Sequence, residues 1–441
     1  MQIRTKTSAS EEPEQTDSQN SAPAAPPEKL AAIVNKTSTL IGWVLQIGVL
    51  VSALVILIGV VMLFLSPGGL SPDKFLTFPH SFSAVGAGLL ALRPQSVIVL
   101  GLLLLIATPV MRVAVSIVAF ALEHDRDYVV ITLIVLIILL CSLFLLGGIA
   151  PMQGHSLFTQ GHYSPLIFVA IFAGAIAAGL LGSLVGLGGG VLIVPLLTLV
   201  FGFPIYFAIG ASIISVIATS SGAAAAYVKD HMTNMRVGMF LELATTTGAI
   251  CGAFLAGLLA PNILSLVFGV ILLVSVAPLI VKIGEELPKG VKNDFLAQKL
   301  NLGSSYPDKH LGQTITYQVR RTPLGLVMMY VAGLISGLLG IGSGTFKVLA
   351  MDVAMRLPMK VSTTTSNFMI GVTAAASAGI YFSRGDISPL IAAPVALGIL
   401  IGALVGARLL EHLSNKMLRI IFIPVIVVAA VEMILHAFGI A

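Results

Sequence analysis

Long runs of apolar residues, broken by short polar segments, fill the chain from about residue 39 to its end. The first three runs lie at about 39–65, 95–122 and 128–148, and each has the roughly 20 apolar residues that a helix needs to cross a bilayer. We therefore expect a three-span accessory membrane domain over residues 39–150. Residues 1–38 are rich in Ser, Glu, Gln, Pro and Ala without a long apolar run, which predicts a disordered cytoplasmic tail.

The rest of the chain shows two sets of five apolar segments. In the first set they lie at about 165–185, 190–202, 206–227, 237–259 and 263–281. In the second set they lie at about 323–339, 344–357, 361–382, 387–409 and 417–438. The second segment of each set is short: about 13 helical residues reach roughly 20 Å, whereas the hydrocarbon layer is about 30 Å thick. We expect the Gly-rich turn before it to dip into the membrane.

The two sets are copies of one unit, because residues 178–253 match residues 332–407 without a gap. The matched positions are mostly Gly, Pro and small polar residues, which a shared backbone geometry requires. Among them, Gly186, Gly188 and Gly190 match Gly340, Gly342 and Gly344, while Ser212 and Thr219 match Ser366 and Thr373. Fused copies of a membrane unit are typical of secondary transporters. We expect repeat 1 over 165–282, a cytoplasmic linker over 283–322 and repeat 2 over 323–440.

Composition agrees with an all-α polytopic membrane protein. The chain is 57% hydrophobic and 10% charged, with a mean hydropathy of +1.03, while soluble domains are only about 45–50% apolar. The net charge of +5 comes from basic residues in loops beside apolar runs, so no nucleic-acid partner is needed. Cys141 and Cys251 both lie within apolar runs, which argues against a disulfide framework or a metal site. We expect no cofactor and no enzymatic activity.

The distribution of Lys and Arg predicts the topology. The segment 282–322 carries seven of them and is therefore cytoplasmic by the positive-inside rule, while the loops 151–164, 203–205 and 260–262 carry none. Five spans per repeat would make the copies inverted, with the N-terminus inside and the C-terminus outside. If the short segments are re-entrant instead, we count four spans and expect parallel copies. Within the repeats, only Arg384, beside Asp386, lies on the outer side.

The Gly-rich stretches before the short helices are candidate anion sites. The stretches GLGGG (186–190) and GIGSG (340–344) leave backbone N–H groups free to point at a ligand, where a helix N-terminus carries partial positive charge. The alternative role of such glycines is close helix packing or a tight turn. The candidate residues are Gly188, Gly189, Gly190, Gly342, Ser343 and Gly344.

Polar side chains near these turns extend the candidate site. Lys347 follows the second turn by three residues and could attract a carboxylate, sulfite or sulfonate group, or could snorkel to the interface. Hydroxyl and amide donors could surround an oxyanion, although Ser and Thr in membrane helices also bond back to their own backbone. These donors are Ser212, Thr219, Thr365, Ser366 and Asn367. We interpret Glu242, Arg112, Glu432 and His436 as interfacial.

At these motifs the sequence resembles the sulfite exporter TauE/SafE family, also called the toluene sulfonate uptake permease family. The resemblance covers about residues 165–440 and is most specific at GLGGGVLIVPLLT (186–198) and PMKVSTTTSNFMIGVTAAAS (358–377). It implies movement of sulfite, thiosulfate or organosulfonates, mostly outward, across the bacterial cytoplasmic (inner) membrane. GIGSG and Leu349, at the position of Pro195, depart from the family pattern. The N-terminal spans resemble a small membrane domain of unknown function.

The sequence thus predicts a multi-pass secondary transporter that moves small sulfur oxyanions or organosulfonates of the sulfite, thiosulfate and sulfoacetate class. We expect export by alternating access, with the site between the repeats. The alternatives are a small-anion channel and an importer of another organic anion. The expected partners are the anionic substrate and the lipid bilayer, with a second copy of the chain as a further candidate. Because the duplicated unit is complete without it, we expect the accessory domain to regulate or stabilise rather than to form the pathway.

Overall fold

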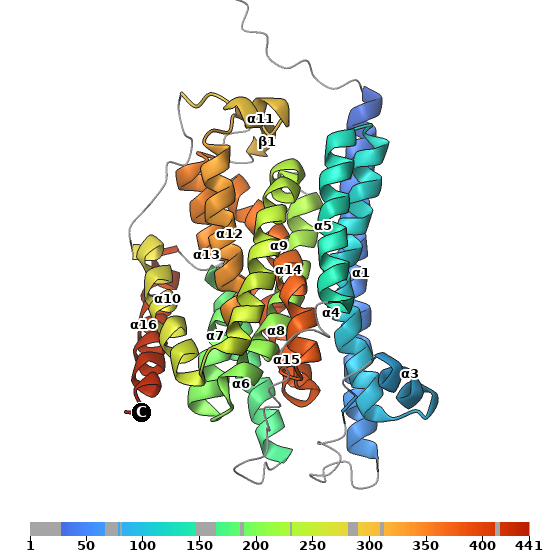
Figure 1. The fold of residues 1–441 in the computed structure, drawn as a ribbon, viewed down its shortest axis with the longest axis vertical. Coiled ribbons are helices and arrows are strands. Elements are labelled where there is room, and N and C mark those ends of the chain that lie inside the picture. Colours follow the sequence, from blue (N-terminus) through green and yellow to red (C-terminus); the bar gives the residue numbers. More distant parts are fainter. Residues whose placement is uncertain are drawn as a thin grey trace, which may run out of the picture.

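The computed structural model describes residues 28–66, 78–79, 82–145, 165–185, 189–229, 232–280, 290–308, 313–410 and 415–440. Its helices lie roughly side by side, with a small β-hairpin at one end and the C-terminus toward the other (Figure 1). Seven of the described helices are long and apolar enough to cross a membrane, namely α1, α4, α5, α8, α9, α12 and α15. The predicted all-α polytopic membrane fold is therefore confirmed.

The accessory unit consists of α1 (Glu28–Leu65), α3 (Phe82–Leu90), α4 (Pro94–Leu122) and α5 (Arg126–Phe144). The three predicted spans correspond to α1, α4 and α5, while the short helix α3 was not predicted. Helix α1 begins inside the segment that we predicted to be a disordered tail. The reason is local: the residues Glu28, Lys29 and Leu30 before the apolar run are good helix formers, so the helix extends beyond it.

Each repeat contains the five predicted segments, with ends close to the predicted ones. Repeat 1 comprises α6 (Pro165–Val185), α7 (Gly190–Pro195) with the π-helical turn η2 (Leu196–Val200), α8 (Ile205–Lys229), α9 (Met235–Leu258) and α10 (Pro261–Ile280). Repeat 2 comprises α12 (Thr322–Leu339), α13 (Gly344–Leu349) with η3 (Ala350–Ala354), α14 (Met359–Ser383), α15 (Pro389–Leu410) and α16 (Asn415–Ala437).

The first two segments of each repeat form a helical hairpin. Its chain enters from one end of the molecule, turns at the centre and returns to the same end. In repeat 2, the backbone N–H of Arg320, just before α12, donates to the carbonyl of Met355, just after η3, at 3.2 Å. In repeat 1, a Cβ on Gly174 of α6 would lie 3.0 Å from the Leu196 side chain of η2. Each repeat therefore has one hairpin, made of its first two segments, followed by three single helices. The short segments are not full spans, contrary to our main topology count.

The copies are nevertheless inverted, because the hairpin returns to its starting end and the three single helices that follow are an odd number. The equivalent helices α8 and α14 run in opposite directions: Gly210, near the start of α8, contacts the carbonyl of Asp386, just past the end of α14. The expectation that re-entrant segments would make the copies parallel was wrong. It counted the short segment as re-entrant but kept its preceding helix as a full span, whereas both belong to one hairpin.

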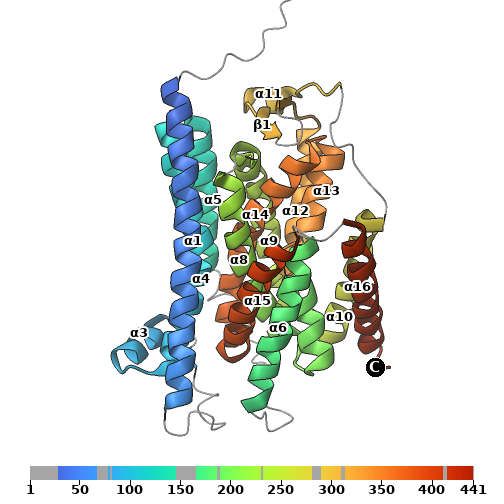
Figure 2. The same cartoon turned by 180° about the vertical axis from the view of Figure 1, so that it is seen from behind.

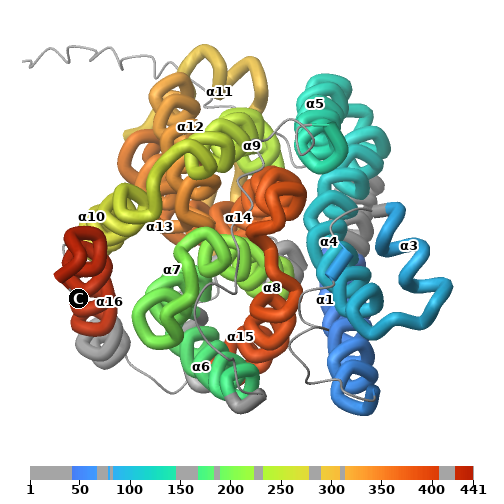
Figure 3. The backbone as a smooth tube through the Cα atoms, turned by 60° about the horizontal axis from the view of Figure 1, so that its bottom comes forward, coloured from blue at the N-terminus to red at the C-terminus, as the bar shows by residue number. Residues whose placement is uncertain are grey.

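The fourth helix of each repeat packs against the first helix of the other repeat. A Cβ on Gly248 of α9 would overlap the carbonyl oxygen of Tyr330 on α12, and one on Gly402 of α15 would overlap that of Ile176 on α6. Both pairs occupy equivalent positions of the repeats, so the same seam occurs twice. Helices α8 and α14 pack against each other at the centre, while α10 and α16 pair at the edge away from the accessory unit (Figures 2 and 3).

The linker between the repeats contains structure that the sequence did not predict. It holds α11 (Phe295–Lys299) and an antiparallel hairpin of β1 (Ser304–Asp308) and β2 (Gln313–Tyr317). The amide of Asn234, at the start of α9, donates to the Tyr317 hydroxyl at 2.8 Å and to the Leu302 carbonyl at 2.9 Å. Burial raises the pKa of Tyr317 to about 12, so this phenol stays neutral at physiological pH.

Candidate functional site

The two Gly-rich turns meet at the centre of the molecule. The hydroxyl of Ser212 on α8 donates to the carbonyl of Gly190 at 3.0 Å and to that of Gly340 at 2.8 Å, and so joins the first turn to the second. The equivalent hydroxyl in repeat 2, Ser366, donates to the carbonyl of Gly344 at 3.2 Å. The duplicated Ser and Gly positions thus form the same hydrogen bond in both copies. Gly188 lies outside the described residues.

The turn of repeat 2 has a backbone that few residues other than glycine adopt. Gly340, Gly342 and Ser343 have φ values of 67°, 71° and 48°, in the left-handed region that disfavours a Cβ. Ser343 accepts this conformation although it has a side chain, and its buried hydroxyl has no hydrogen-bond partner within the described residues. The departure of GIGSG from a full glycine run therefore places a strained, unsatisfied hydroxyl at the start of α13.

Lys347 lies in the interior, with no exposed surface. Its Nζ donates to the Thr373 hydroxyl at 2.6 Å, and this hydroxyl donates to Oε1 of Glu242 at 2.8 Å. The three residues connect α13, α14 and α9, so they bridge the two repeats. The snorkelling alternative for Lys347 is excluded by this burial. One of its three N–H donors is used within the described residues, which leaves two for another acceptor.

Two residues that we interpreted as interfacial are instead buried at this centre. Glu242 is 1% exposed and Arg112 is 0% exposed, and Glu242 interacts electrostatically with both Lys347 and Arg112. The interpretation failed because it measured their distance from the helix ends along the sequence, while helix packing places them deep inside. The available signal was their charge within an apolar run, which is expensive unless it is used. Glu432 and His436 of α16 are exposed.

The remaining predicted residues divide between local and site roles. Thr219 bonds back to the Ser215 carbonyl of its own helix at 3.0 Å. Thr365 accepts a hydrogen bond from the backbone N–H of Asn234 at 3.1 Å and so fixes the start of α9. Asn367 is 7% exposed, and the structure gives its side chain no partner among the described residues. Gly189 precedes α7 and abuts Ile399 of α15.

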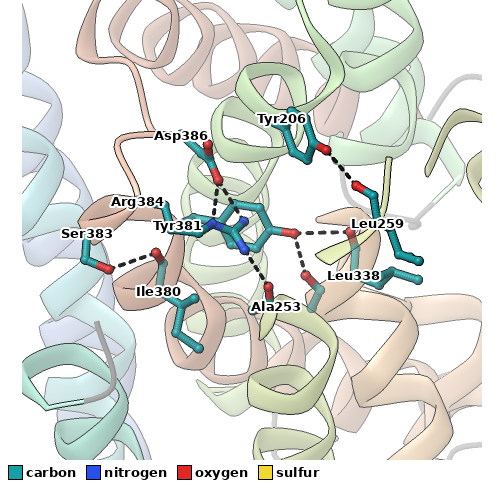
Figure 4. Close-up of polar contacts among 10 residues, drawn as sticks. Tyr206, Ala253, Leu259, Leu338, Ile380, Tyr381, Ser383, Arg384 and Asp386 are labelled. Atoms are coloured by element: carbon teal, nitrogen blue, oxygen red, sulfur yellow. Dashed lines mark hydrogen bonds and ion pairs between the residues drawn. The ribbon is translucent and has the colours of Figure 1, made fainter. Parts of the chain in front are cut away.

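A second buried polar cluster lies at the end of α14 away from the β-hairpin (Figure 4). Nε of Arg384 donates to Oδ2 of Asp386 at 2.7 Å, and its Nη1 donates to the Ala253 carbonyl at 2.8 Å. The guanidinium carbon lies 4.4 Å from the ring centroid of Tyr381, whose hydroxyl donates to the Gly337 carbonyl at 2.8 Å. Asp386 neutralises Arg384 locally, which explains why this buried basic residue is tolerated.

Comparison with known proteins identifies two matched regions. The family model described as Sulfite exporter TauE/SafE matches residues 171–433, which is more than half of the chain. The model described as Protein of unknown function (DUF1634) matches residues 41–144. No solved structure matches the chain.

Curated relatives match about 60% of the chain. It is 27% identical over 275 residues to the probable membrane transporter protein YunE of Bacillus subtilis (strain 168), a match covering 60% of this chain and 97% of the relative. It is 25% identical over 255 residues to the probable membrane transporter protein YdhB of the same organism, a match covering 58% of this chain and 93% of the relative. It is 25% identical over 294 residues to the probable membrane transporter protein MamO of Paramagnetospirillum magneticum, a match covering 62% of this chain and 45% of the relative.

Proposed function

Because the chain belongs to the sulfite exporter TauE/SafE family of membrane transporters, we propose that it is a secondary transporter of small sulfur oxyanions or organosulfonates. The anion binds at the centre, between the two Gly-rich turns and beside the Lys347 ammonium. The β-hairpin end faces the cytoplasm, the C-terminus lies outside, and transport is outward across the bacterial cytoplasmic membrane.

The buried Lys347 carries the proposal. An anion that enters the hydrocarbon layer loses hydration worth several kcal/mol, whereas one helix N-terminus returns roughly 0.3 to 2 kcal/mol. A cation must therefore contribute. Lys347 is the cation at the start of α13, and its bond to the neutral hydroxyl of Thr373 keeps Glu242 from pairing with it directly. The ammonium thus retains charge and donors for an oxyanion.

The arrangement of the repeats supports alternating access. The hairpin α6–α7 enters from one end and the hairpin α12–α13 from the other, and their turns meet at Ser212. Inverted repeats that share a central site can exchange conformations, so that the site opens to one side and then to the other. A sulfonate or sulfite group offers three oxygens, which suits a site built from hydroxyls, backbone N–H groups and one ammonium.

Transport and binding measurements test this function. Purified protein in proteoliposomes should export sulfite, thiosulfate or sulfoacetate with saturation, and preloaded unlabelled substrate should drive counterflow. Lys347→Met should weaken anion binding by at least about tenfold, or roughly 1.4 kcal/mol, because it removes the cation. Lys347→Arg should keep part of the affinity.

Lys360→Met is the matched control, since Lys360 is exposed at the start of α14. It should change binding much less. Equal, small effects of the two substitutions in folded protein would remove Lys347 from the site. A flux that rises linearly with concentration and shows no counterflow would favour a small-anion channel over a carrier.

A further inference from the structure

Arg112 belongs to the accessory unit, but its guanidinium lies inside the transporter repeats. Its Nη1 donates to the backbone carbonyl of Phe368 on α14, and its Cζ lies 5.1 Å from the centroid of the Phe368 ring. Its Nη2 lies 3.4 Å from the Ser221 hydroxyl of α8. The side chain is completely buried, and Arg112 is the only ionisable residue in the sequence of α4. The accessory unit thus inserts one charge between the central helices of the two repeats.

Stability alone does not explain this charge. In the described part of the chain, no Asp or Glu lies within ion-pair distance of Arg112. Its partners there are a carbonyl, a hydroxyl and an aromatic face, none of which neutralises it, and its Nε has no partner. A buried charge without a counter-charge is costly, and an apolar side chain of similar size would pack at less cost.

The charges around the centre do not balance. Glu242, Lys347 and Arg112 are all buried, and Glu242 is attracted to both basic residues. With the carboxyl group ionised, the three groups together carry one net positive charge. One carboxylate oxygen of Glu242 has no hydrogen-bond partner within the described residues. A ligand with a single negative charge would neutralise the set. The net charge therefore favours a monovalent anion.

The accessory unit also holds one whole side of α14. Besides the bond of Arg112 to Phe368, the Ser142 hydroxyl of α5 donates to the carbonyl of Ala376, and Gly379 lies against the backbone of Leu143. The other side of α14 carries Thr373, which contacts Lys347 and Glu242. Helix α14 consequently lies between the accessory helices α4 and α5 on one side and α13 on the other, as Figure 3 shows.

We propose that Arg112 is the second cation of the anion site, supplied by the accessory unit. The inference rests on the proposed function and assigns the ligand to the class of monovalent oxyanions. Arg112 is a positioning residue: its charge offsets that of Glu242, and its hydrogen bond to Phe368 fixes α14. The accessory unit is therefore part of the binding machinery, contrary to the expectation that it only regulates or stabilises.

Binding to the full-length protein tests this inference. The probe is methanesulfonate, which carries a single negative charge at any working pH, titrated calorimetrically at a fixed, mildly alkaline pH. Arg112→Gln keeps a donor for the Phe368 carbonyl but removes the charge, and it should weaken binding at least about tenfold. Arg112→Lys keeps the charge and should stay within about threefold of the wild type. Ser142→Ala removes the other bond to α14 without changing charge and should also stay within about threefold.

The double substitution Arg112→Gln with Glu242→Gln separates charge from structure, because it restores the net charge of +1. It should recover most of the affinity that Arg112→Gln loses, while a purely structural role of Arg112 would give no recovery. Wild-type affinity in Arg112→Gln, or a double variant as weak as the single one, would overturn the inference. If Arg112→Gln does not fold, the double variant decides. A folded double variant that binds the anion more than about tenfold more weakly than Arg112→Lys would also overturn the inference. Wild-type protein that binds no tested anion would overturn the proposed function as well.

Discussion

At the scale of single residues, buried charges depend on their partners. Arg384 and Asp386 are both 1% exposed in their side chains, and the carboxylate is the only negative group that the described residues place against this guanidinium. Asp386→Asn should therefore lower the free energy of unfolding by about 3–5 kcal/mol, since it leaves the arginine charge buried without a counter-charge. Thermal or chemical unfolding of the purified protein in detergent measures this loss.

Ser383→Ala provides the control for this prediction, because the Ser383 hydroxyl only donates to the Ile380 carbonyl of its own helix. It should change stability by less than about 1 kcal/mol. The double substitution of Arg384 and Asp386 by Leu should recover much of the stability, since it removes both charges. Equal stabilities of Asp386→Asn and Ser383→Ala would contradict the prediction.

At the scale of elements, the two glycine seams fix how the repeats interlock. Gly248 and Gly402 are equivalent positions, and each allows a helix to touch a carbonyl oxygen of the other repeat. A methyl group at either position forces the helices apart. Gly248→Ala and Gly402→Ala should each destabilise the protein by about 1–3 kcal/mol, the usual cost of overpacking, as measured by unfolding in detergent.

Gly222 supplies the comparison, since a Cβ there would meet nothing within 4 Å. Gly222→Ala should leave stability unchanged or raise it slightly, because Ala is the better helix former. A loss at Gly222 as large as that at the seams would mean that the effect comes from helix propensity and not from the helix contact.

At the scale of the whole molecule, the inverted repeats predict which segments lie on the same side of the membrane. Ser305 lies on β1 and Asn262 at the start of α10, and both are exposed. We expect single cysteines at these two positions to react with an impermeant reagent from opposite sides, Ser305→Cys from the cytoplasm. The background should have Cys141 and Cys251 replaced, since Cys251 is itself exposed. Labelling of both positions from one side would rule out the topology.

The sequence by itself determined the elements and their duplication. The apolar runs predicted the helices of the two repeats to within a few residues, because a helix that spans a bilayer needs a fixed length of apolar side chains. The glycines and serines of both turns recur at a constant offset between the copies. This repetition predicted that Ser212 and Ser366 occupy equivalent places. The position of Lys347, directly after the second turn, was sufficient to nominate it for the site.

Only the tertiary structure decided which side chains meet. Arg112 and Thr373 are 261 positions apart in the chain, yet Arg112 packs against α14, the helix that carries Thr373. Glu242, from the other repeat, accepts a hydrogen bond from Thr373. The hairpins likewise depend on tertiary contacts, such as that between Arg320 and Met355 in repeat 2, which no periodicity encodes. A hydrophobic pattern records whether a residue avoids water, whereas the depth and the partner of a buried charge follow from how helices pack in three dimensions.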